Sequence, residues 1–171
     1  MRSSRRGNLL LRNPLARGEC AVRILFYKYK ILTEALERNH MSRREIREQI
    51  FKLLFRAEFY EEGELPEQLQ LFFEDLDKKE EKDTNYIQEK FGQILARLPE
   101  IDGMVNAVAQ GWKTTRMGKV DLTLIRLAVY EIKFEEGIPT GVAINEAVEL
   151  AKSYGTDDSA SFVNGILAKL A

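Results

Sequence analysis

Apolar side chains recur every three or four positions along most of the chain after residue 42, and this spacing places them on one face of an α-helix. The segments with this period are 43–60, 66–76, 84–98, 101–112, 121–134, 140–154 and 158–170. No segment shows the convincing alternation of apolar and polar residues that indicates a half-buried β-strand. The pattern therefore predicts an all-α fold, a bundle of about seven helices with short connections.

Glycine, proline and aspartate mark the expected boundaries between these helices. Pro99 is expected to separate the third helix from the fourth, because proline tends to end a helix. A natural division of the body then falls near Pro99, between about 41–98 and 99–171. Gly155 is expected to end a helix in the left-handed conformation, which glycine adopts without a Cβ penalty. Asp121 is expected to cap the fifth helix, whose mostly apolar surface indicates a central, buried element.

Charge is distributed unevenly along the chain. Residues 1–40 hold nine Lys and Arg against three Asp and Glu, a net charge of +6, whereas residues 41–171 hold 17 against 24, a net charge of −7. This asymmetry predicts a basic N-terminal extension, 1–40, followed by an acidic helical domain, 41–171. Within the extension, residues 19–38 have an amphipathic helical pattern of their own.

Three interpretations of the extension stay open at this point. In the first, translation begins at Met41 and the extension has no role in the fold. In the second, residues 1–18 form an organelle transit peptide, because they are rich in arginine and lack acidic residues. In the third, their positive charge serves as a nucleic-acid-binding tail.

The composition argues against several kinds of site. One cysteine and one histidine cannot form a disulfide or a structural zinc site. No apolar run approaches the roughly 18 residues that a membrane span needs. The segment GWKTTRMGK (111–119) fails as a phosphate loop, because the spacing of its glycines is wrong and Val120 replaces the magnesium-binding Ser or Thr. We therefore expect no catalytic residue, metal, cofactor or small-molecule substrate.

Arginines gather at the start of the first helix of the acidic domain. Arg43, Arg44 and Arg47 lie in or near its first turn, where cations oppose the helix dipole. This placement does not favour helix stability, which suggests a binding partner, although ordinary solvated surface arginines remain the alternative.

The amino-acid sequence of the second half of the chain resembles that of the NusB family of transcription antitermination factors. The segments that carry the resemblance are VDLTLIRLAVYEI (120–132), IPTGVAINEAVELAKSYG (138–155) and DDSASFVNGIL (157–167). It continues upstream to the arginine-rich helix that follows Met41, and it covers about 130 residues. INEAVELAK followed by FVNG is the most specific part.

The resemblance implies an all-α fold of two packed helical subdomains and a role in transcription antitermination. It implies binding of boxA RNA together with the small-subunit ribosomal protein NusE, within the antitermination complex of RNA polymerase, in support of ribosomal RNA operons. It also implies a cytoplasmic protein with neither a membrane partner nor a small-molecule substrate, with organelle targeting by residues 1–18 as the less favoured location.

The resemblance assigns roles to particular residues. It implies RNA contacts for the arginines of the first helix and for two aromatic residues: Arg43, Arg44, Arg47, Phe55 and Phe162. It implies partner contacts for Asp121 and Asp158. Arginine suits single-stranded RNA because its guanidinium binds phosphate and stacks on unpaired bases.

Two departures from the family pattern leave alternatives open. The arginine cluster is interrupted by Glu45 and Glu48, and RGECAVRILFY (17–27) also resembles the family's first helix. A protein–protein adaptor with weak RNA binding is therefore one alternative. The other is the RNA-binding domain of a ribosomal RNA methyltransferase, which the lack of a glycine-rich cofactor segment disfavours.

Overall fold

The computed structural model describes residues 29, 40–61, 63–76, 80–109 and 111–171. The chain forms two units, Met1–Asn39 and His40–Ala171. In the first unit only Tyr29 is described; it is helical and 69% exposed. The expectations about the basic extension therefore lie outside the described residues. The second unit, described below, is the helical domain.

The described residues of the second unit form helices and no strand. The helices are α2 (Arg43–Ala57), α3 (Leu65–Glu74), α4 (Glu81–Val108), η1 (Thr114–Arg116), α5 (Lys119–Phe134), α6 (Thr140–Tyr154) and α7 (Ser159–Leu167). All are α-helices except η1, which is a single 3-10 turn. The predicted all-α fold is confirmed.

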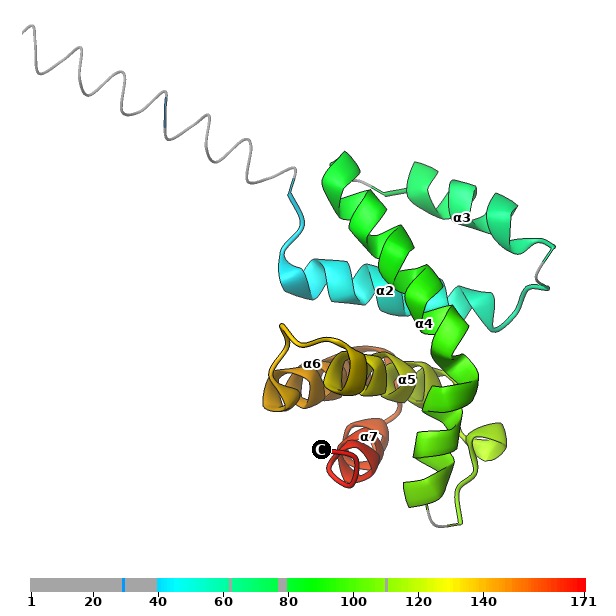
Figure 1. Cartoon of the computed structure of the whole chain (residues 1–171), viewed down its shortest axis with the longest axis vertical. Coiled ribbons are helices and arrows are strands. Elements are labelled where there is room, and N and C mark those ends of the chain that lie inside the picture. Colours follow the sequence, from blue (N-terminus) through cyan, green and yellow to red (C-terminus); the bar gives the residue numbers. More distant parts are fainter. Residues whose placement is uncertain (1–28, 30–39, 62, 77–79, 110) are drawn as a thin grey trace, which may run out of the picture. The chain divides into compact units, whose positions relative to one another are not determined.

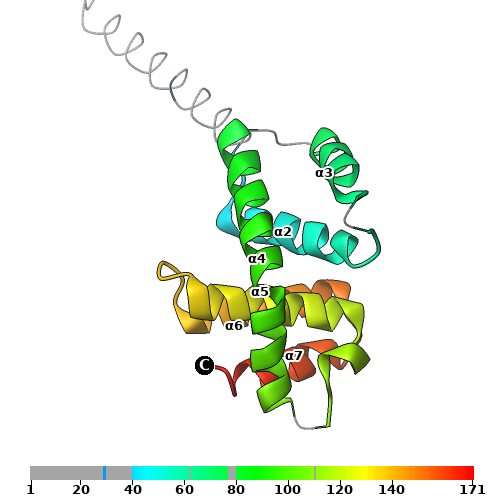
Figure 2. The same cartoon turned by 45° about the vertical axis from the view of Figure 1, so that its right-hand side comes forward.

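Helix α5 is the centre of the unit. It contacts α2 and α4 as well as α6 and α7, and Figures 1 and 2 show it between α2 and α7 with α4 crossing it. Its side chains Leu124, Ile125 and Val129 have no measurable exposure. The expectation of a buried central helix is confirmed, and its cause is the apolar surface that this segment presents on nearly all sides.

Helix α4 differs from the prediction, because one helix of 28 residues replaces the two expected on either side of Pro99. The proline costs about 3 kcal/mol inside a helix, since it lacks an N–H and its ring crowds the preceding turn. Ile94 and Ile101, on either side of Pro99, are both fully buried. The stripe of buried side chains thus continues through the proline, and we attribute the continuity of the helix to this packing.

Gly155 ends α6, but its conformation differs from the expected left-handed one. Its φ is −95° and its ψ is −166°, which is extended backbone. A Cβ at this position would overlap the side chain of Ser159 and lie 2.7 Å from the carbonyl oxygen of Ala151. Glycine is therefore needed for the close approach of α6 and α7, which are tightly packed neighbours.

Candidate nucleic-acid interface

The first turn of α2 presents two of the three predicted arginines to solvent. Arg43 and Arg44 are exposed. The turn is held by a capping box, in which the Glu45 backbone N–H donates to Ser42 Oγ at 3.2 Å and the Ser42 N–H donates to Glu45 Oε2 at 2.8 Å. The Glu45 that interrupts the arginine cluster in sequence thus stabilises the helix start that carries it.

Arg47 points into the protein, where the expectation placed it among RNA contacts. It is 8% exposed, and its Nε donates to Glu131 Oε1 of α5 at 2.8 Å. Its Nη1 lies 3.5 Å from Glu146 Oε2 of α6. Arg47 therefore links three helices below the surface, and it does not share the exposed position of Arg43 and Arg44.

Burial changes the acid–base behaviour of the partner carboxylate. Glu131 is 6% exposed, and burial raises the pKa of its carboxyl above the ordinary glutamate value, against the opposing effect of Arg47. Within the described part of the chain, Glu131 Oε2 and Glu146 Oε2 are buried without a hydrogen-bond partner. This cluster is incompletely satisfied.

Phe55 belongs to a row of aromatic rings that begins in α2 and continues into the turn after it. Its ring centroid lies 6.2 Å from that of Phe51 and 5.1 Å from that of Phe59. Phe51 is buried, Phe55 is half-buried, and Phe59 is 61% exposed. The row therefore runs from the core to the surface, and Phe59, which was not among the predicted site residues, offers the most accessible ring.

Tyr154 at the end of α6 extends this aromatic surface. Its ring packs on Phe51 at 5.1 Å and lies under Lys52, whose Nζ is 5.7 Å from the ring centroid. Its hydroxyl donates a hydrogen bond to Glu48, which also pairs with Lys52. The exposed side of α2 thus combines aromatic rings with both positive and negative groups.

The predicted residues of the last helix lie near a different aromatic group. Phe162 is half-buried, and its ring meets that of Trp112 edge to face at 6.1 Å between centroids. Asp158 is exposed immediately before α7, as its N-cap residue. The pairing of Phe162 with Trp112 could not be seen in the sequence, because Trp112 was assigned to a helical stripe and is instead 53% exposed in a loop.

Asp121 lies in the first turn of α5, not at the predicted cap position. The helix begins at Lys119 after Gly118, whose carbonyl oxygen accepts the N–H of Leu122 at 2.9 Å. Asp121 Oδ1 is buried and lacks a hydrogen-bond partner among the described residues. An acidic group in the first turn still favours the helix dipole.

Arg126 is a second, largely buried arginine, which the sequence did not single out as a functional residue. It donates from Nε and Nη2 to the two carboxylate oxygens of Asp102 on α4, each at 2.7 Å, and from Nη1 to Glu58 after α2. Lys119 Nζ also pairs with Glu58 at 2.5 Å. The hydrogen bond from Lys119 and the charge of Arg126 overcome the opposing effect of burial and lower the pKa of Glu58.

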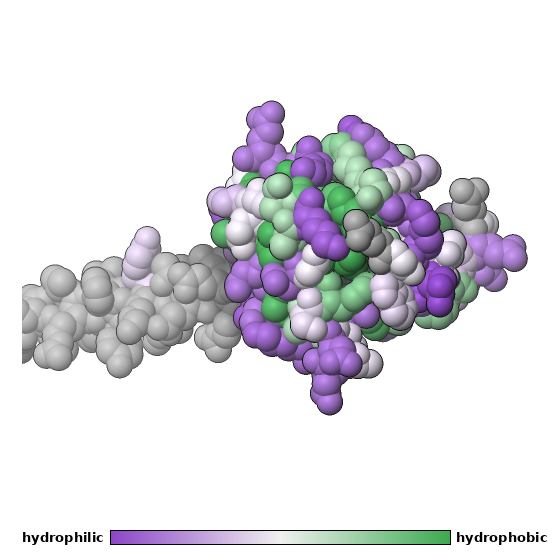
Figure 3. Space-filling view, turned by 90° about the horizontal axis from the view of Figure 1, so that it is seen from below, coloured by the Kyte–Doolittle hydropathy of each residue, from purple (hydrophilic) through white to green (hydrophobic). Residues whose placement is uncertain are grey.

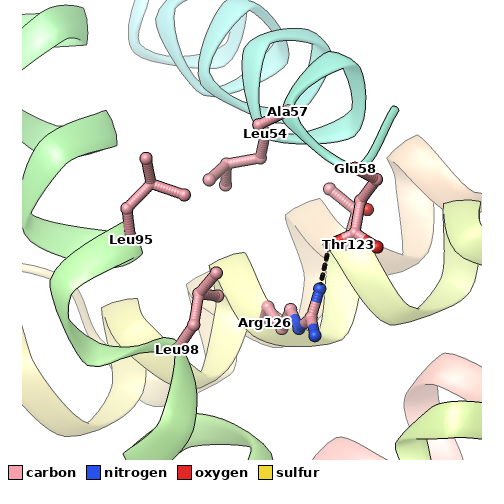
Figure 4. A pocket seen from close by; sticks show the side chains of 7 residues that line it. All are labelled: Leu54, Ala57, Glu58, Leu95, Leu98, Thr123 and Arg126. Carbon is pink, nitrogen blue, oxygen red and sulfur yellow. Dashed lines mark hydrogen bonds and ion pairs between the residues drawn. The ribbon is translucent and has the colours of Figure 1, made fainter. Parts of the chain in front are cut away.

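Arg126 and Glu58 border a small cavity, which Figure 4 shows between the end of α2, the middle of α4 and α5. Its volume is about 50 Å³. Pockets that enclose small-molecule ligands measure roughly 300–1,000 Å³. We interpret this space as a packing gap at the junction of three helices, since the charged groups beside it are already paired.

His40, Glu80 and Asp83 bring potential metal ligands within 4.8 Å of one another. His40 Nδ1 lies 3.1 Å from Asp83 Oδ2, and the same oxygen accepts the backbone N–H of Met41 at 2.8 Å. Asp83 is 2% exposed. Its carboxylate is therefore already engaged in fixing the first residues of the folded unit to α4.

Within the described part of the chain, no helix has the length and apolar character that crossing a bilayer requires.

Comparison with known proteins identifies the family. The NusB family model matches residues 44–171. The transcription antitermination protein NusB of Agathobacter rectalis is 54% identical over 131 residues, which cover 77% of this chain and 100% of that protein. The protein of the same name from Lachnoclostridium phytofermentans is 52% identical over 130 residues, covering 76% of this chain and 98% of that protein.

Solved structures agree with this assignment. The structure of T. maritima NusB has a TM-score of 0.68 and 38% sequence identity, and the match covers 77% of this chain and 91% of that one. A crystal structure of antitermination factors NusB and NusE in complex with dsRNA has a TM-score of 0.63 and 25% identity, covering 75% and 94%. The resemblance seen in the sequence is confirmed: the chain belongs to the NusB family of transcription antitermination factors.

Proposed function

We propose that this protein binds single-stranded boxA-type RNA together with the ribosomal protein NusE, and so supports transcription of ribosomal RNA operons by the antitermination complex in the cytoplasm. The observation that carries the proposal is the pair of exposed arginines, Arg43 and Arg44, on the capped first turn of α2. The similar solved complex of NusB and NusE with dsRNA supports NusE and RNA as partners.

The residues divide into three roles in this proposal. Arg43 and Arg44 bind phosphates, because a guanidinium forms paired, charge-assisted hydrogen bonds with phosphate oxygens. Phe55 and Phe162 supply aromatic surface for unpaired bases. Arg47 acts indirectly, since its ion pair with Glu131 fixes the orientation of the helix that carries the two exposed arginines.

Asp121 and Asp158 are proposed as contacts for NusE. Asp158 is exposed at the start of α7 and is free to face a basic partner. Asp121 is half-buried in the first turn of α5, and the exposed part of its side chain is proposed to face the same partner.

The test is a titration of labelled boxA RNA with the whole chain, with and without purified NusE. We expect the double variant Arg43→Ala/Arg44→Ala to bind RNA at least tenfold more weakly than the wild type. Its log–log salt slope should be shallower by about 1.4, because single-stranded RNA contributes about 0.7 for each phosphate neutralised. The measurement is fluorescence anisotropy at several salt concentrations.

The matched control is Lys82→Ala/Lys133→Ala, which removes the same charge from two other exposed positions. It should change RNA affinity and salt slope much less. If the wild-type protein does not bind the RNA, either with or without NusE, the proposal is wrong. If the arginine variant keeps both the affinity and the slope while NusE still binds, the protein is an adaptor, which the burial of Arg47 would then help to explain.

A further inference from the structure

Trp112 is the single tryptophan of the chain and lies on the surface. It is 53% exposed, in the loop that joins α4 to η1. Figure 3 looks onto the end of the unit where α4 ends and η1 lies, and it shows hydrophobic residues surfacing among hydrophilic ones. A tryptophan left half in water presents a large apolar face, and such faces are common where proteins bind partners or bases.

The ring is accompanied by an arginine and a second aromatic residue. The guanidinium carbon of Arg116 lies over the indole at 5.8 Å from its centroid. Phe162 packs against Trp112 with an interplanar angle of 71°, an edge-to-face arrangement. Phe162 therefore contacts the indole edge to face and Arg116 lies over the ring, while about half of the Trp112 surface stays exposed to solvent.

The loop holds Trp112 in a defined place. Asn106 of α4 accepts the backbone N–H of Thr114 at 2.9 Å and donates to the hydroxyl of Thr114 at 3.1 Å. Thr114 is 6% exposed, so this pair anchors the loop from inside. Gly111 has a φ of +79°, which favours glycine, and it turns the chain just before Trp112. A ring held in advance loses little entropy on binding.

The charge of the loop favours a polyanion. Residues 111–119 contain Lys113, Arg116 and Lys119 and no acidic residue. Lys113 and Arg116 are exposed, whereas Lys119 is engaged with Glu58. Lys169 adds a further cation beside the loop, since its Nζ lies 3.5 Å from the carbonyl oxygen of Val108 at the end of α4.

We propose that Trp112 and Arg116 form a second RNA site, in which an unpaired base stacks on the indole and Lys113 and Arg116 bind the adjoining phosphates. Stacking on an aromatic ring suits single-stranded RNA, because its bases are free to turn outward and each has a π face. This inference rests on the proposed RNA-binding function, and it extends the interface from α2 to the loop before α5.

A basic protein partner is the competing occupant of the same surface. Asp158 lies one helical turn before Phe162, and aromatic residues and arginine are also frequent in protein interfaces. The cations of the loop favour RNA over such a partner, because they would repel its positive charge. The experiment below measures both occupants separately.

Intrinsic fluorescence tests the proposal directly, since all tryptophan emission of the full chain comes from position 112. We expect boxA RNA to quench this emission with the same concentration dependence as its binding measured by anisotropy. Trp112→Ala should lower RNA affinity about tenfold, whereas Trp112→Phe should retain most of it. The control Tyr86→Ala removes another partly exposed aromatic ring, which lies on α4, and should leave the affinity unchanged.

Abasic RNA identifies the stacked base. One abasic position should weaken wild-type binding and have little further effect on Trp112→Ala, because the two changes remove the same contact. Thermal unfolding by circular dichroism checks that Trp112→Ala is folded, and Lys113→Gln/Arg116→Gln provides a second variant that keeps the fluorophore. That variant should bind RNA more weakly and with a shallower salt slope.

The outcomes separate this inference from the proposed function. RNA binding with unchanged Trp112 emission and unchanged affinity of Trp112→Ala overturns the inference and leaves the proposed function intact. A response of Trp112 to NusE alone, with none to RNA, also overturns it and assigns the surface to the protein partner. Absence of any RNA binding, with or without NusE, overturns both.

Discussion

Arg47 and Arg126 are both largely buried and both pair with carboxylates, but their guanidinium groups differ in how completely they are hydrogen-bonded. The side chain of Arg47 is 9% exposed and that of Arg126 is 12% exposed, and each lies between two carboxylates from other parts of the fold. Arg126 binds both oxygens of Asp102 and also Glu58. Arg47 forms one hydrogen bond to Glu131 and lies 3.5 Å from Glu146.

Burial alone therefore does not make an ion pair stabilising. A charge removed from water loses hydration energy, and only complete hydrogen bonding replaces it. The carboxyl pKa values record the result: Glu58 beside Lys119 and Arg126 has a lowered pKa, and Glu131 beside Arg47 has a pKa raised by burial. We infer that the Arg126 cluster stabilises the fold, whereas the Arg47 cluster stabilises it little and orients α2.

The largest effect is expected from Arg126→Ala. The substitution leaves Asp102 and Glu58 without their shared cation, and it should lower the free energy of unfolding by about 3 kcal/mol. Urea denaturation followed by circular dichroism measures this loss. The control Lys152→Ala removes an exposed ion pair with Glu149 and should cost less than about 1 kcal/mol. Equal losses in the two variants would contradict the contrast between the sites.

A smaller loss is expected from Arg47→Met, about 1–2 kcal/mol at neutral pH. Methionine preserves the apolar packing of the stem, and Glu131, whose pKa is already raised, becomes neutral by taking up a proton at modest cost. Adding Glu131→Gln should recover most of the loss, because it removes the charge left unpaired. A double variant less stable than Arg47→Met would show that the Arg47 cluster is a net source of stability.

The pH dependence should have opposite signs for the two glutamates, with the smallest effects of the series. Glu58 has a lowered pKa, so its contribution is present above the ordinary glutamate pKa and is lost as the pH falls through its folded value. Glu131 has a raised pKa, so its contribution is present below the ordinary value and is lost as the pH rises through its folded value.

The variants Glu58→Gln and Glu131→Gln separate these contributions. Glu58→Gln should remove part of the loss of stability on acidification, and Glu131→Gln should remove part of the loss on going from acid to neutral pH. Urea denaturation of both variants and the wild type across this range gives the slopes. Slopes of the same sign would mean that the two carboxyls do not differ in environment as the structure indicates.

Local patterns in the sequence were sufficient for the helices and for the family. The apolar spacing of α5 predicted its central position, because a helix that is apolar on most of its surface has to be surrounded by protein. The sequence motifs INEAVELAK and FVNG indicated the family. These features depend on neighbours a few residues apart, which a sequence displays directly.

The candidate site was less accessible to prediction because its contacts are distant in sequence. Arg47 and Glu131 are 84 positions apart, so the first-turn arginines looked alike although one of them is buried. Trp112 resembled a core residue until its loop and its contact with Phe162 were placed. The one local signal for this site was the basic stretch 111–119, which has no acidic residue. From the sequence, this stretch was considered only as a phosphate loop.

The continuity of α4 through Pro99 has a consequence for cooperativity. A helix of 28 residues extends about 42 Å at 1.5 Å per residue. It contacts α2, α5 and η1 along this length, so melting any part of it withdraws support from the others. We therefore expect the regions before and after the proline to unfold together, so that urea denaturation of His40–Ala171 shows a single transition.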